Sequence, residues 1–358
     1  MKKTLALLLA VLMIACMLSA CSSTDTAAPA AAATTEDAAQ SAQTETPAAE
    51  APADAAAPAD TTKAPEDMVL GYINYTDALD TPMRFHKGVE KVCEENGIKV
   101  LYAEASGSET EMMAACDNFI LQGADIIVDS NWNVAGGSAL VQKCNDAGIP
   151  LISIDTLYEG ENSYFVGVDN DFAGYTAGEA AAKYIEKKFG GKVDNVVVSY
   201  SANLESINGR TTNAVAAIRD AGIDVPEDHY FELECGNGDA TQMAKQQMTD
   251  WLTAHPTGTV AVVAGNNEMG LGFQAAIESQ NRQDDCILVS NGLDANVEAI
   301  MESGSELWVA AVDYMPDYYG DTLVPLAIQL VNGERPSEIM HYVQIRYIDG
   351  DNFSEIYG

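Results

Sequence analysis

The chain has few basic residues. Of its 358 residues, 18 are Lys or Arg and 54 are Asp or Glu, so the formal net charge at pH 7 is −36. Nucleic acids and anionic membrane surfaces are recognised through clustered Lys and Arg side chains. The composition therefore argues against both as partners, and we expect no binding to nucleic acid.

Motifs of catalysis and metal binding are also missing. The four histidines, His86, His229, His255 and His341, are not paired by motif with a Ser or Cys nucleophile, and no G-x-S-x-G, HExxH or P-loop pattern occurs. Residues 169–171, Asp-Asn-Asp, resemble the beginning of a calcium loop but lack its glycine and its distal glutamate. We therefore expect a helix cap or a turn at this point, and no enzyme activity, metal or cofactor.

Closely spaced cysteines are absent as well. The sequence has seven Cys and no CxxC pattern; Cys16 belongs to an N-terminal leader, and Cys21 directly follows that leader. The other five are odd in number and widely separated, which indicates neither a zinc site nor a disulfide framework. A free cysteine in a core behaves as a small hydrophobic residue. We therefore expect a structural role for all five, namely Cys93, Cys116, Cys144, Cys235 and Cys286.

A long apolar run occurs only at the N-terminus. Lys2 and Lys3 make the first three residues positive, and residues 5–18 are apolar but too few to span a membrane. Leu-Ser-Ala-Cys at 18–21 resembles the cleavage site of bacterial lipoproteins, which predicts a signal peptide over residues 1–20 and lipidation of Cys21. Two acyl chains, at about 0.8 kcal/mol per buried methylene, would anchor the protein stably to the cell membrane. An ordinary secretory signal that happens to contain a cysteine is the alternative.

The next segment, residues 21–66, has a low-complexity composition. It consists mainly of Ala, Thr, Pro, Asp and Glu and has almost no large apolar residue. Such a segment cannot bury enough surface to offset its ordering entropy, so it is predicted to be a disordered tether. A flexible chain of this length would span about 35–40 Å.

From residue 68 onward, short apolar runs alternate regularly with helical patterns. Strands are predicted at 68–73, 99–104 and 124–128, and the intervening helices at 84–96, 110–122 and 134–147 are each followed by glycine. After a strand at 151–154, a second series of the same kind begins with a helix at 173–189 and ends with an extended segment at 340–347. This alternation is typical of βαβ units. The sequence therefore predicts an α/β fold with parallel sheets in two lobes.

Several phrases of the sequence, taken together, resemble a known family. They are IPLISID at 149–155, VGVDNDFAGYTAG at 166–178, INGR at 207–210, LTAHP at 252–256, VAGNNEMGLG at 263–272, MPDYYG at 315–320 and VNGE at 331–334. In this order they resemble the sugar-type (type I) periplasmic binding proteins, closest in pattern to the ribose-binding class of ABC-transporter solute-binding proteins. The resemblance implies two Rossmann-like lobes joined by three crossings, with a ligand held between them by hinge closure. It implies lobes made of residues 67–170 plus 314–340 and 171–313 plus 341–358.

The resemblance also implies site residues. Asp155 matches the acid after the fourth strand, while Thr156 and Asn208 stand where the family usually has arginines. Arg210 fits a nearby structural arginine, and Asn266 matches an asparagine of the family site. For Asp155 and Asn266, helix capping is the alternative function, because both stand at strand-to-helix turns.

Further candidates lie at the other strand ends. Either Asn291 or Asp294 would take the place of a second acid, and Tyr314 matches a polar residue beside Asp313. Tyr75 and Asp77 follow the first strand, and Asp129 and Ser130 end the third. Trp132 or Tyr158 would supply the aromatic ring that stacks on a sugar, unless these rings only make surface or hinge contacts.

The loss of two arginines bears on the ligand. A pocket of acids, amides and tyrosines with few cations suits a neutral sugar or polyol better than a phosphorylated or carboxylated ligand. We therefore expect a monomeric, membrane-anchored, extracytoplasmic protein that delivers such a ligand to an ABC permease. A sensory lipoprotein that presents a sugar-like signal to a chemoreceptor or sensor kinase is the alternative. An effector domain of a lac-repressor-type regulator is disfavoured by the export signal.

Overall fold

The computed structural model describes residues 62–202, 205–236 and 239–357. The predicted signal peptide, the predicted lipidation site Cys21 and most of the predicted tether lie outside these residues. Within them, every helix is either too short or too polar to cross a membrane.

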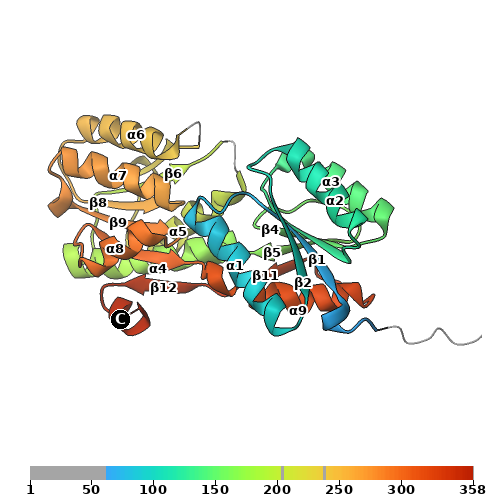
Figure 1. The fold of residues 1–358 in the computed structure, drawn as a ribbon. Helices are drawn as coiled ribbons and strands as arrows, with labels where there is room; N and C mark the ends of the chain where they lie inside the picture. Colours follow the sequence, from blue (N-terminus) through green and yellow to red (C-terminus); the bar gives the residue numbers. More distant parts are fainter. Residues whose placement is uncertain (1–61, 203–204, 237–238, 358) are drawn as a thin grey trace, which may run out of the picture. The chain divides into compact units, whose positions relative to one another are not determined.

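Two six-stranded sheets form the framework (Figure 1). The first has the order β11-β5-β4-β3-β1-β2 and the second the order β12-β10-β9-β8-β6-β7. The first sheet comprises β1 (Val69–Asn74), β2 (Lys99–Glu104), β3 (Ile126–Ser130), β4 (Leu151–Ile154), β5 (Ser163–Gly167) and β11 (Met340–Tyr342). The second comprises β6 (Asn195–Tyr200), β7 (Tyr230–Glu234), β8 (Val260–Ala264), β9 (Cys286–Asn291), β10 (Trp308–Asp313) and β12 (Arg346–Asp349). Only the β10–β12 pair is antiparallel among these strands, which confirms the predicted α/β fold with parallel sheets in two lobes.

Helices cover both faces of each sheet. Beside the first sheet, α1 (Asp80–Glu95) packs on α9 (Tyr319–Val331), and α2 (Glu109–Leu121) packs on α3 (Val134–Ala147). Beside the second, α4 (Asn170–Phe189) packs on α5 (Gly209–Asp220), and α6 (Ala240–Ala254) packs on α7 (Asn267–Ser279). The short helices α8 (Ala295–Glu302) and α10 (Phe353–Tyr357) contact each other, and α10 has no counterpart in the predicted pattern. Because both faces are covered, the central strands β3, β4, β8 and β9 are buried along their whole length.

The α4–α5 contact is close enough to require small residues. A Cβ atom on Gly174 would lie 2.2 Å from the carbonyl oxygen of Gly209, and one on Gly178 would lie 2.2 Å from that of Ala214. These two glycines lie one turn apart on α4, so a single face of that helix meets the backbone of α5. The contact fixes the first turn of α5, which carries Arg210.

The chain passes between the two sheets three times. It leaves the first sheet between β5 and α4, returns between β10 and α9 through a 3-10 turn (Pro316–Tyr318), and leaves again between β11 and β12. At the first crossing the Asp169 carboxylate caps α4 by accepting hydrogen bonds from the backbone N–H groups of Asp171 and Phe172. The predicted helix cap at residues 169–171 and the three crossings are thereby confirmed.

Two expected boundaries need correction. The extended segment predicted at 340–347 is two strands in different sheets, and His341 and Tyr342 pair with Val166 and Gly167 of β5. The expected lobe boundary at residue 340 therefore cuts through β11, and the third crossing follows Tyr342. The ordered body also begins before residue 67, because Lys63 donates hydrogen bonds to the Asp125 carboxylate at 2.6 and 2.7 Å.

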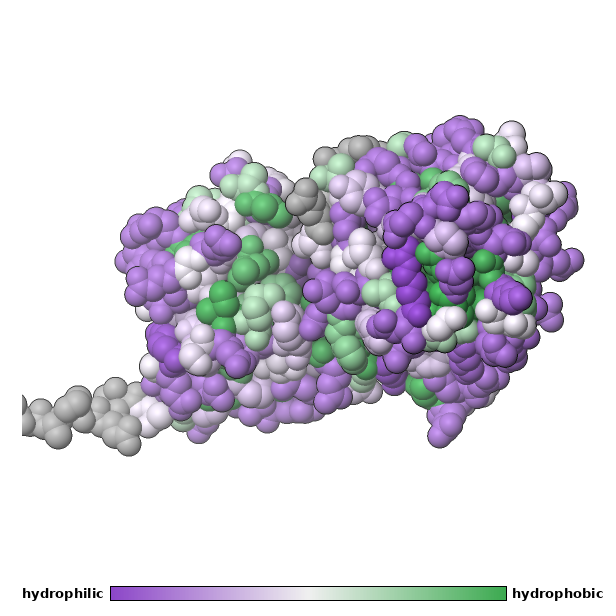
Figure 2. Space-filling view, turned by 180° about the vertical axis from the view of Figure 1, so that it is seen from behind, coloured by the Kyte–Doolittle hydropathy of each residue, from purple (hydrophilic) through white to green (hydrophobic). Residues whose placement is uncertain are grey.

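On the face seen in Figure 2, hydrophilic residues predominate and hydrophobic ones form separate patches. Single exposed apolar side chains are common on folded proteins and need no special explanation. The more informative groups are the buried polar side chains, which gather near the ends of the strands.

Candidate functional site

The predicted site residues gather at the carboxyl ends of the parallel strands. Parallel strands present their carboxyl ends at one edge of a sheet, and open α/β sheets bind ligands beyond that edge. In the first lobe, the strands β1, β3 and β4 lead to Tyr75, Asp77, Asp129, Ser130, Trp132, Asp155 and Thr156. In the second lobe, the strands β6, β8, β9 and β10 lead to Asn208, Asn266, Asn291, Asp294 and Tyr314.

Asp155 holds a strained position directly after β4. Its φ of 55° lies in the left-handed region, which non-glycine residues adopt rarely and often at functional sites. Its Oδ1 accepts a hydrogen bond from the backbone N–H of Val168 at 3.0 Å, and the Tyr319 hydroxyl donates to both carboxylate oxygens at 3.1 Å. Burial raises the pKa of Asp155, and the positive charge of Arg210 offsets this only in part. Since Asp155 caps no helix, the capping alternative is wrong for this residue.

Arg210 is the residue that the sequence reasoning underrated. It was expected to be structural, and two of its nitrogens do make structural contacts: Nε donates to the side-chain oxygen of Asn170 at 2.7 Å, and Nη1 donates to the Gly265 carbonyl at 3.2 Å. Its guanidinium also lies over the Tyr314 ring, 4.8 Å from the ring centre. The signal available in the sequence was its place in the first turn of a helix that follows a strand end.

Asp155, Arg210 and Tyr314 influence one another electrostatically across the two lobes. Burial raises the pKa of Tyr314, the Arg210 charge lowers it and the Asp155 charge raises it further. No ion pair joins Asp155 to Arg210 among those in the described part of the chain. Two opposite charges from two lobes thus lie near each other without direct pairing.

In the second lobe, Asn291 and Tyr314 keep buried polar atoms without partners among the described residues. Asn291 donates from Nδ2 to the carbonyl oxygens of Arg210 and Ala264 at 3.2 and 3.3 Å, but its Oδ1 has no partner among the described residues. The Tyr314 hydroxyl has none there either. A buried polar atom in this condition costs about 1–3 kcal/mol, so both atoms are suited to a ligand hydroxyl.

The two aromatic candidates, Trp132 and Tyr158, have different surroundings. Trp132 stacks on Tyr75 with ring centres 5.5 Å apart, and its Nε1 donates to the Ile154 carbonyl at 3.1 Å. Tyr158 is buried instead, with its hydroxyl bonded to Asp129 at 2.9 Å and its ring against the backbone of Gly137. The expectation that Tyr158 could stack on a ligand is therefore wrong, which leaves Trp132 of the two.

The remaining residues of the first lobe form local networks. Ser130 donates to the Asn74 side chain at 3.0 Å, and Asn74 in turn donates to Asp77 at 2.7 Å. Asp129 is fully buried, and burial raises its pKa to about 7 against a hydrogen bond from Tyr158. Its Oδ1 has no partner among the residues that the structure describes. Thr156 is half-buried beside Asp155.

Three residues of the second lobe are occupied by backbone contacts. Asn208 exchanges two hydrogen bonds with the backbone of Ser201, at 2.9 and 3.0 Å, and so closes the turn between β6 and α5. Asn266 accepts from the Met269 N–H and caps α7, as its alternative function stated. Asp294 caps α8 by accepting from Asn296 and Val297. Of the two residues considered for the second acid, Asn291 is the one with an open acceptor.

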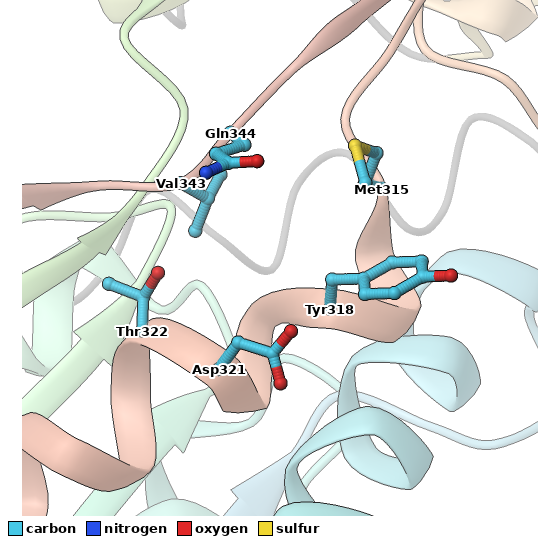
Figure 3. A pocket seen from close by; sticks show the side chains of 6 residues that line it. All are labelled: Met315, Tyr318, Asp321, Thr322, Val343 and Gln344. Atoms are coloured by element: carbon cyan, nitrogen blue, oxygen red, sulfur yellow. The ribbon is translucent and has the colours of Figure 1, made fainter.

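A small cavity lies at the crossings (Figure 3). Its volume is about 190 Å³, and its lining comes from the second crossing, the first turn of α9 and the third crossing. The lining residues are Met315, Tyr318, Asp321, Thr322, Val343 and Gln344. None of the predicted site residues lines it, so we treat it as part of the connecting region.

A comparison with known families decides the classification. A family profile described as a periplasmic binding protein domain matches residues 70–335, which is most of the chain. The chain belongs to the periplasmic binding protein family.

Relatives of this binding protein match most of its length. The ribose import binding protein RbsB of Bacillus subtilis (strain 168) is 28% identical over 253 residues, which cover 70% of this chain and 77% of that protein. The D-xylose-binding periplasmic protein of Escherichia coli (strain K12) is 23% identical over 253 residues, covering 69% and 72%.

Solved structures share the fold. An ABC transporter solute binding protein from Bacillus halodurans C-125 with bound myo-inositol superposes with a TM-score of 0.63 at 22% identity, covering 81% of this chain and 96% of that chain. A periplasmic solute binding protein from Actinobacillus succinogenes 130z with bound D-allose gives 0.66 at 20% identity, covering 80% and 99%. The predicted resemblance and the expectation of a binding protein rather than an enzyme are confirmed by the family and its relatives. Separately, the described ranges contain no group of three or more His, Cys, Asp or Glu placed to hold a metal ion.

Proposed function

We propose that this periplasmic binding protein captures a neutral sugar or polyol between its lobes and delivers it to an ABC importer. Relatives of the chain are named for the ribose and xylose that they bind. The observation that carries the proposal is the pair of open polar atoms on Tyr314 and Asn291, at the strand ends beside Arg210. A sugar hydroxyl both donates and accepts hydrogen bonds, so it can satisfy a phenol and an amide oxygen alike.

The charges of the site favour a neutral ligand. Thr156 and Asn208 stand where the family usually has arginines, and the charge of Arg210 is balanced by that of Asp155. A phosphate or carboxylate would need an uncompensated cation. Hydroxyl groups could instead bridge the carboxylate and the guanidinium, with each charge-assisted hydrogen bond contributing about 1.5–3 kcal/mol.

The aromatic pair offers a second kind of contact. Trp132 and Tyr75 stack on each other at the carboxyl edge of the first sheet, and Trp132 has a φ of 57°. The C–H face of a sugar packs well on such a ring. We assign Trp132 this role, with Tyr75 behind it as support.

The lobes would close on the ligand as hinged bodies. We assign residues 62–169 with 314–342 to the first lobe and residues 170–313 with 346–357 to the second. This division follows the membership of the strands in the two sheets. The three crossings are then the hinge, because hinge motions concentrate in a few connecting residues.

Export and anchoring complete the proposal. The leader at residues 1–20, Cys21 and the low-complexity segment after it fit a monomeric lipoprotein held outside the cytoplasm by its acyl chains. Relatives of the chain are named as periplasmic or import binding proteins, which supports an extracytoplasmic site of action.

A thermal-shift screen tests the ligand class. The panel contains neutral aldoses, cyclitols and furanosyl compounds, with sugar phosphates and sugar acids alongside. A ligand that binds only the folded state raises the free energy of unfolding, by about 2.7 kcal/mol when its concentration is one hundred times its Kd, and therefore also raises the Tm. We expect shifts from one or more neutral compounds, and selective shifts from the phosphates would refute the proposal.

The same assay tests the site. Asp155→Ala should abolish the shift given by the neutral ligand while the ligand-free protein still unfolds cooperatively. Asp224→Ala, a change of the same kind at an exposed position, is the matched control and should bind as the parent protein does. Normal binding by the Asp155 variant would place the ligand elsewhere.

A further inference from the structure

Arg84, on α1 of the first lobe, reaches across to the second lobe. Its Nη1 donates a hydrogen bond to the backbone carbonyl of Leu293 at 3.2 Å and lies 3.7 Å from Oε1 of Glu298. Leu293 follows β9, just after Asn291 with its open acceptor atom, and Glu298 lies on α8. Outside the three crossings, these contacts are the only hydrogen bond and ion pair that join the two lobes among the described residues. A single side chain thus links α1 to the strand-end loop of the other lobe.

The rest of the guanidinium is held from the side of the first lobe. Nε and Nη2 both donate to Oδ2 of Asp317, at 3.0 and 2.6 Å, in the 3-10 turn of the second crossing. Asp80, one turn earlier on α1, has its Oδ2 3.6 Å from Nη1. The Arg84 side chain is only 15% exposed, so these pairs are better shielded from water than ordinary surface pairs, which contribute little. A planar guanidinium with five donors can hold all these contacts at once.

The charges around Arg84 are unbalanced. Asp80 and Asp317 approach it from the first lobe and Glu298 from the second, so three carboxylates share one cation. Burial raises the pKa of Glu298, and the charge of Arg84 lowers it. The carboxylates of Asp80 and Asp317 raise that pKa further, because they repel a second negative charge. Without Arg84, like charges would face each other across the two lobes, so this side chain both attracts the lobes and cancels a repulsion between them.

We propose that Arg84 is an interlobe latch, which holds the two lobes together over the site and so raises the affinity for the ligand. The inference rests on the hinge closure and ligand capture proposed above. A contact between hinged lobes favours the arrangement in which it is made. A ligand that needs the closed arrangement is bound more weakly in proportion to the protein that is open. Arg84 is thus a positioning residue, because it sets how often the loop that carries Asn291 meets the first lobe.

The distance between the lobes in the ligand-free protein tests the latch. In the full chain, non-natural amino acids in place of the exposed residues Glu111 on α2 and Lys245 on α6 carry spin labels, so the native cysteines stay unlabelled. Electron–electron double resonance then gives the distribution of distances between the labels. Arg84→Ala should raise the ratio of open to closed protein about tenfold, which appears as a growth of the longer distances. A distribution equal to that of the parent protein would overturn the proposal.

Lys87→Ala is the matched control for the loss of a cation from α1. Lys87 pairs with Glu90 on the same helix rather than with the second lobe, so this variant should keep the distances of the parent protein. A shift as large as that of Arg84→Ala would count against the latch, since it would show an effect of net charge alone.

Glu298→Gln keeps the test decisive if the Arg84 variant folds poorly, because it removes only the carboxylate of the second lobe. Alone, it should lengthen the distances, since an attraction to Arg84 is lost. In the Arg84→Ala background it should shorten them, since there it removes a repulsion. Equal lengthening in both backgrounds would show that the two side chains act independently, which contradicts the latch.

Ligand affinity supplies a second readout. With the neutral ligand found in the screen, calorimetry should give a Kd about five- to tenfold higher for Arg84→Ala and an unchanged Kd for Lys87→Ala. A lower Tm with unchanged distances and Kd would show that Arg84 is merely structural and would refute the latch. The distance measurement uses no ligand, so it decides the latch even if the screen refutes the proposed ligand class.

Discussion

Tyr314 and Tyr319 lie close together in the sequence but carry hydroxyls in opposite situations. The Tyr319 hydroxyl donates to both oxygens of Asp155, while the Tyr314 hydroxyl is buried with no partner among the described residues. A satisfied buried hydroxyl holds its neighbours in place, whereas an unsatisfied one reduces the stability of the ligand-free protein. At the residue scale, the candidate site is defined by these open atoms rather than by the polar residues that cap helices.

Replacement of Tyr314 by Phe should separate binding from stability. The variant keeps the ring beneath Arg210 and loses only the unpartnered hydroxyl. We expect the free energy of unfolding of the ligand-free protein to stay level or rise by about 1 kcal/mol, and ligand affinity to fall about tenfold. Denaturant unfolding and calorimetry with the ligand found in the screen measure the two quantities.

The matched control is Tyr319→Phe. This change removes a donor from a buried carboxylate and should lower the free energy of unfolding by about 1.5–3 kcal/mol. If both variants destabilise the protein equally, then the Tyr314 hydroxyl contributes as much to stability as the Tyr319 hydroxyl, and it is not an unsatisfied group.

Asp129 should make stability depend on pH near neutrality. Burial raises the pKa of Asp129 to about 7 in the folded state, above the usual 3.8 that the unfolded chain retains. Between these values the folded state binds more protons than the unfolded state, so this group's contribution to stability is fully present below about pH 4 and is lost as the pH rises through 7. Asp129→Asn keeps an acceptor for Tyr158 and removes the titration.

The comparison of two pH profiles checks this expectation. The difference in free energy of unfolding between Asp129→Asn and the parent protein should move in favour of the variant by on the order of 2 kcal/mol between pH 5 and pH 8. Asp224→Asn, at an exposed position, should follow the parent profile. A difference that stays constant with pH would show that Asp129 does not titrate in this range.

At the scale of elements, the position of Arg210 depends on how α4 and α5 pack. The glycines of α4 bring the backbone of α5 close, and the first turn of α5 then carries Arg210 toward Tyr314 and Asp155. The crossing that leads into α4 begins at Asp169, which caps the helix. One helix therefore serves both the hinge and the site.

Gly178→Ala should disturb this packing. The added methyl group would lie 2.2 Å from the Ala214 carbonyl oxygen, a backbone atom that can yield only if the helices separate. We expect a loss of about 2 kcal/mol in the free energy of unfolding, within the range of overpacked cores, together with weaker ligand binding. Thermal or denaturant unfolding measures the loss. Gly350→Ala, where the methyl group would meet nothing within 4 Å, is the control and should change stability little.

At the scale of the whole molecule, the described body belongs to a family of binding proteins, and its proposed retention at a membrane depends on the leader. The formal charge of −36 gives no attraction to anionic lipids, so the proposed attachment would come from a covalent lipid. Because the described residues begin at 62, this part of the proposal rests on the sequence alone.

Cys21→Ser should release the protein from the membrane. Without the thiol there is no acceptor for the lipid, so the exported protein should appear in the soluble extracytoplasmic fraction. Membrane fractionation of the expressing cells, with immunoblotting, follows the change. Cys16→Ser lies within the predicted signal peptide and should leave the protein membrane-bound; solubility of both variants, or of neither, would contradict the assignment of Cys21.

Much of the fold could be predicted because its strands and helices follow from patterns of neighbouring residues. Apolar runs alternating with glycine-ended helices indicated the parallel sheets, and family phrases such as the one ending at Asp155 located the carboxyl edge. The split of residues 340–347 into two strands was missed, because an extended segment carries no local signal of which sheet it joins. Likewise, Tyr158 and Trp132 are equivalent as loop aromatics in sequence, and only packing against Gly137 buries the first.

The sequence by itself determined the class of the molecule: its two-lobed α/β pattern, its acidity and the residues at each strand end. These depend on the spacing and composition of near neighbours, which the chain states directly. The tertiary structure alone decided which polar atoms remain open. Arg210, Asp155 and Tyr314 come from segments far apart in the chain. Their charges and hydrogen-bonding atoms interact only across distances that folding sets.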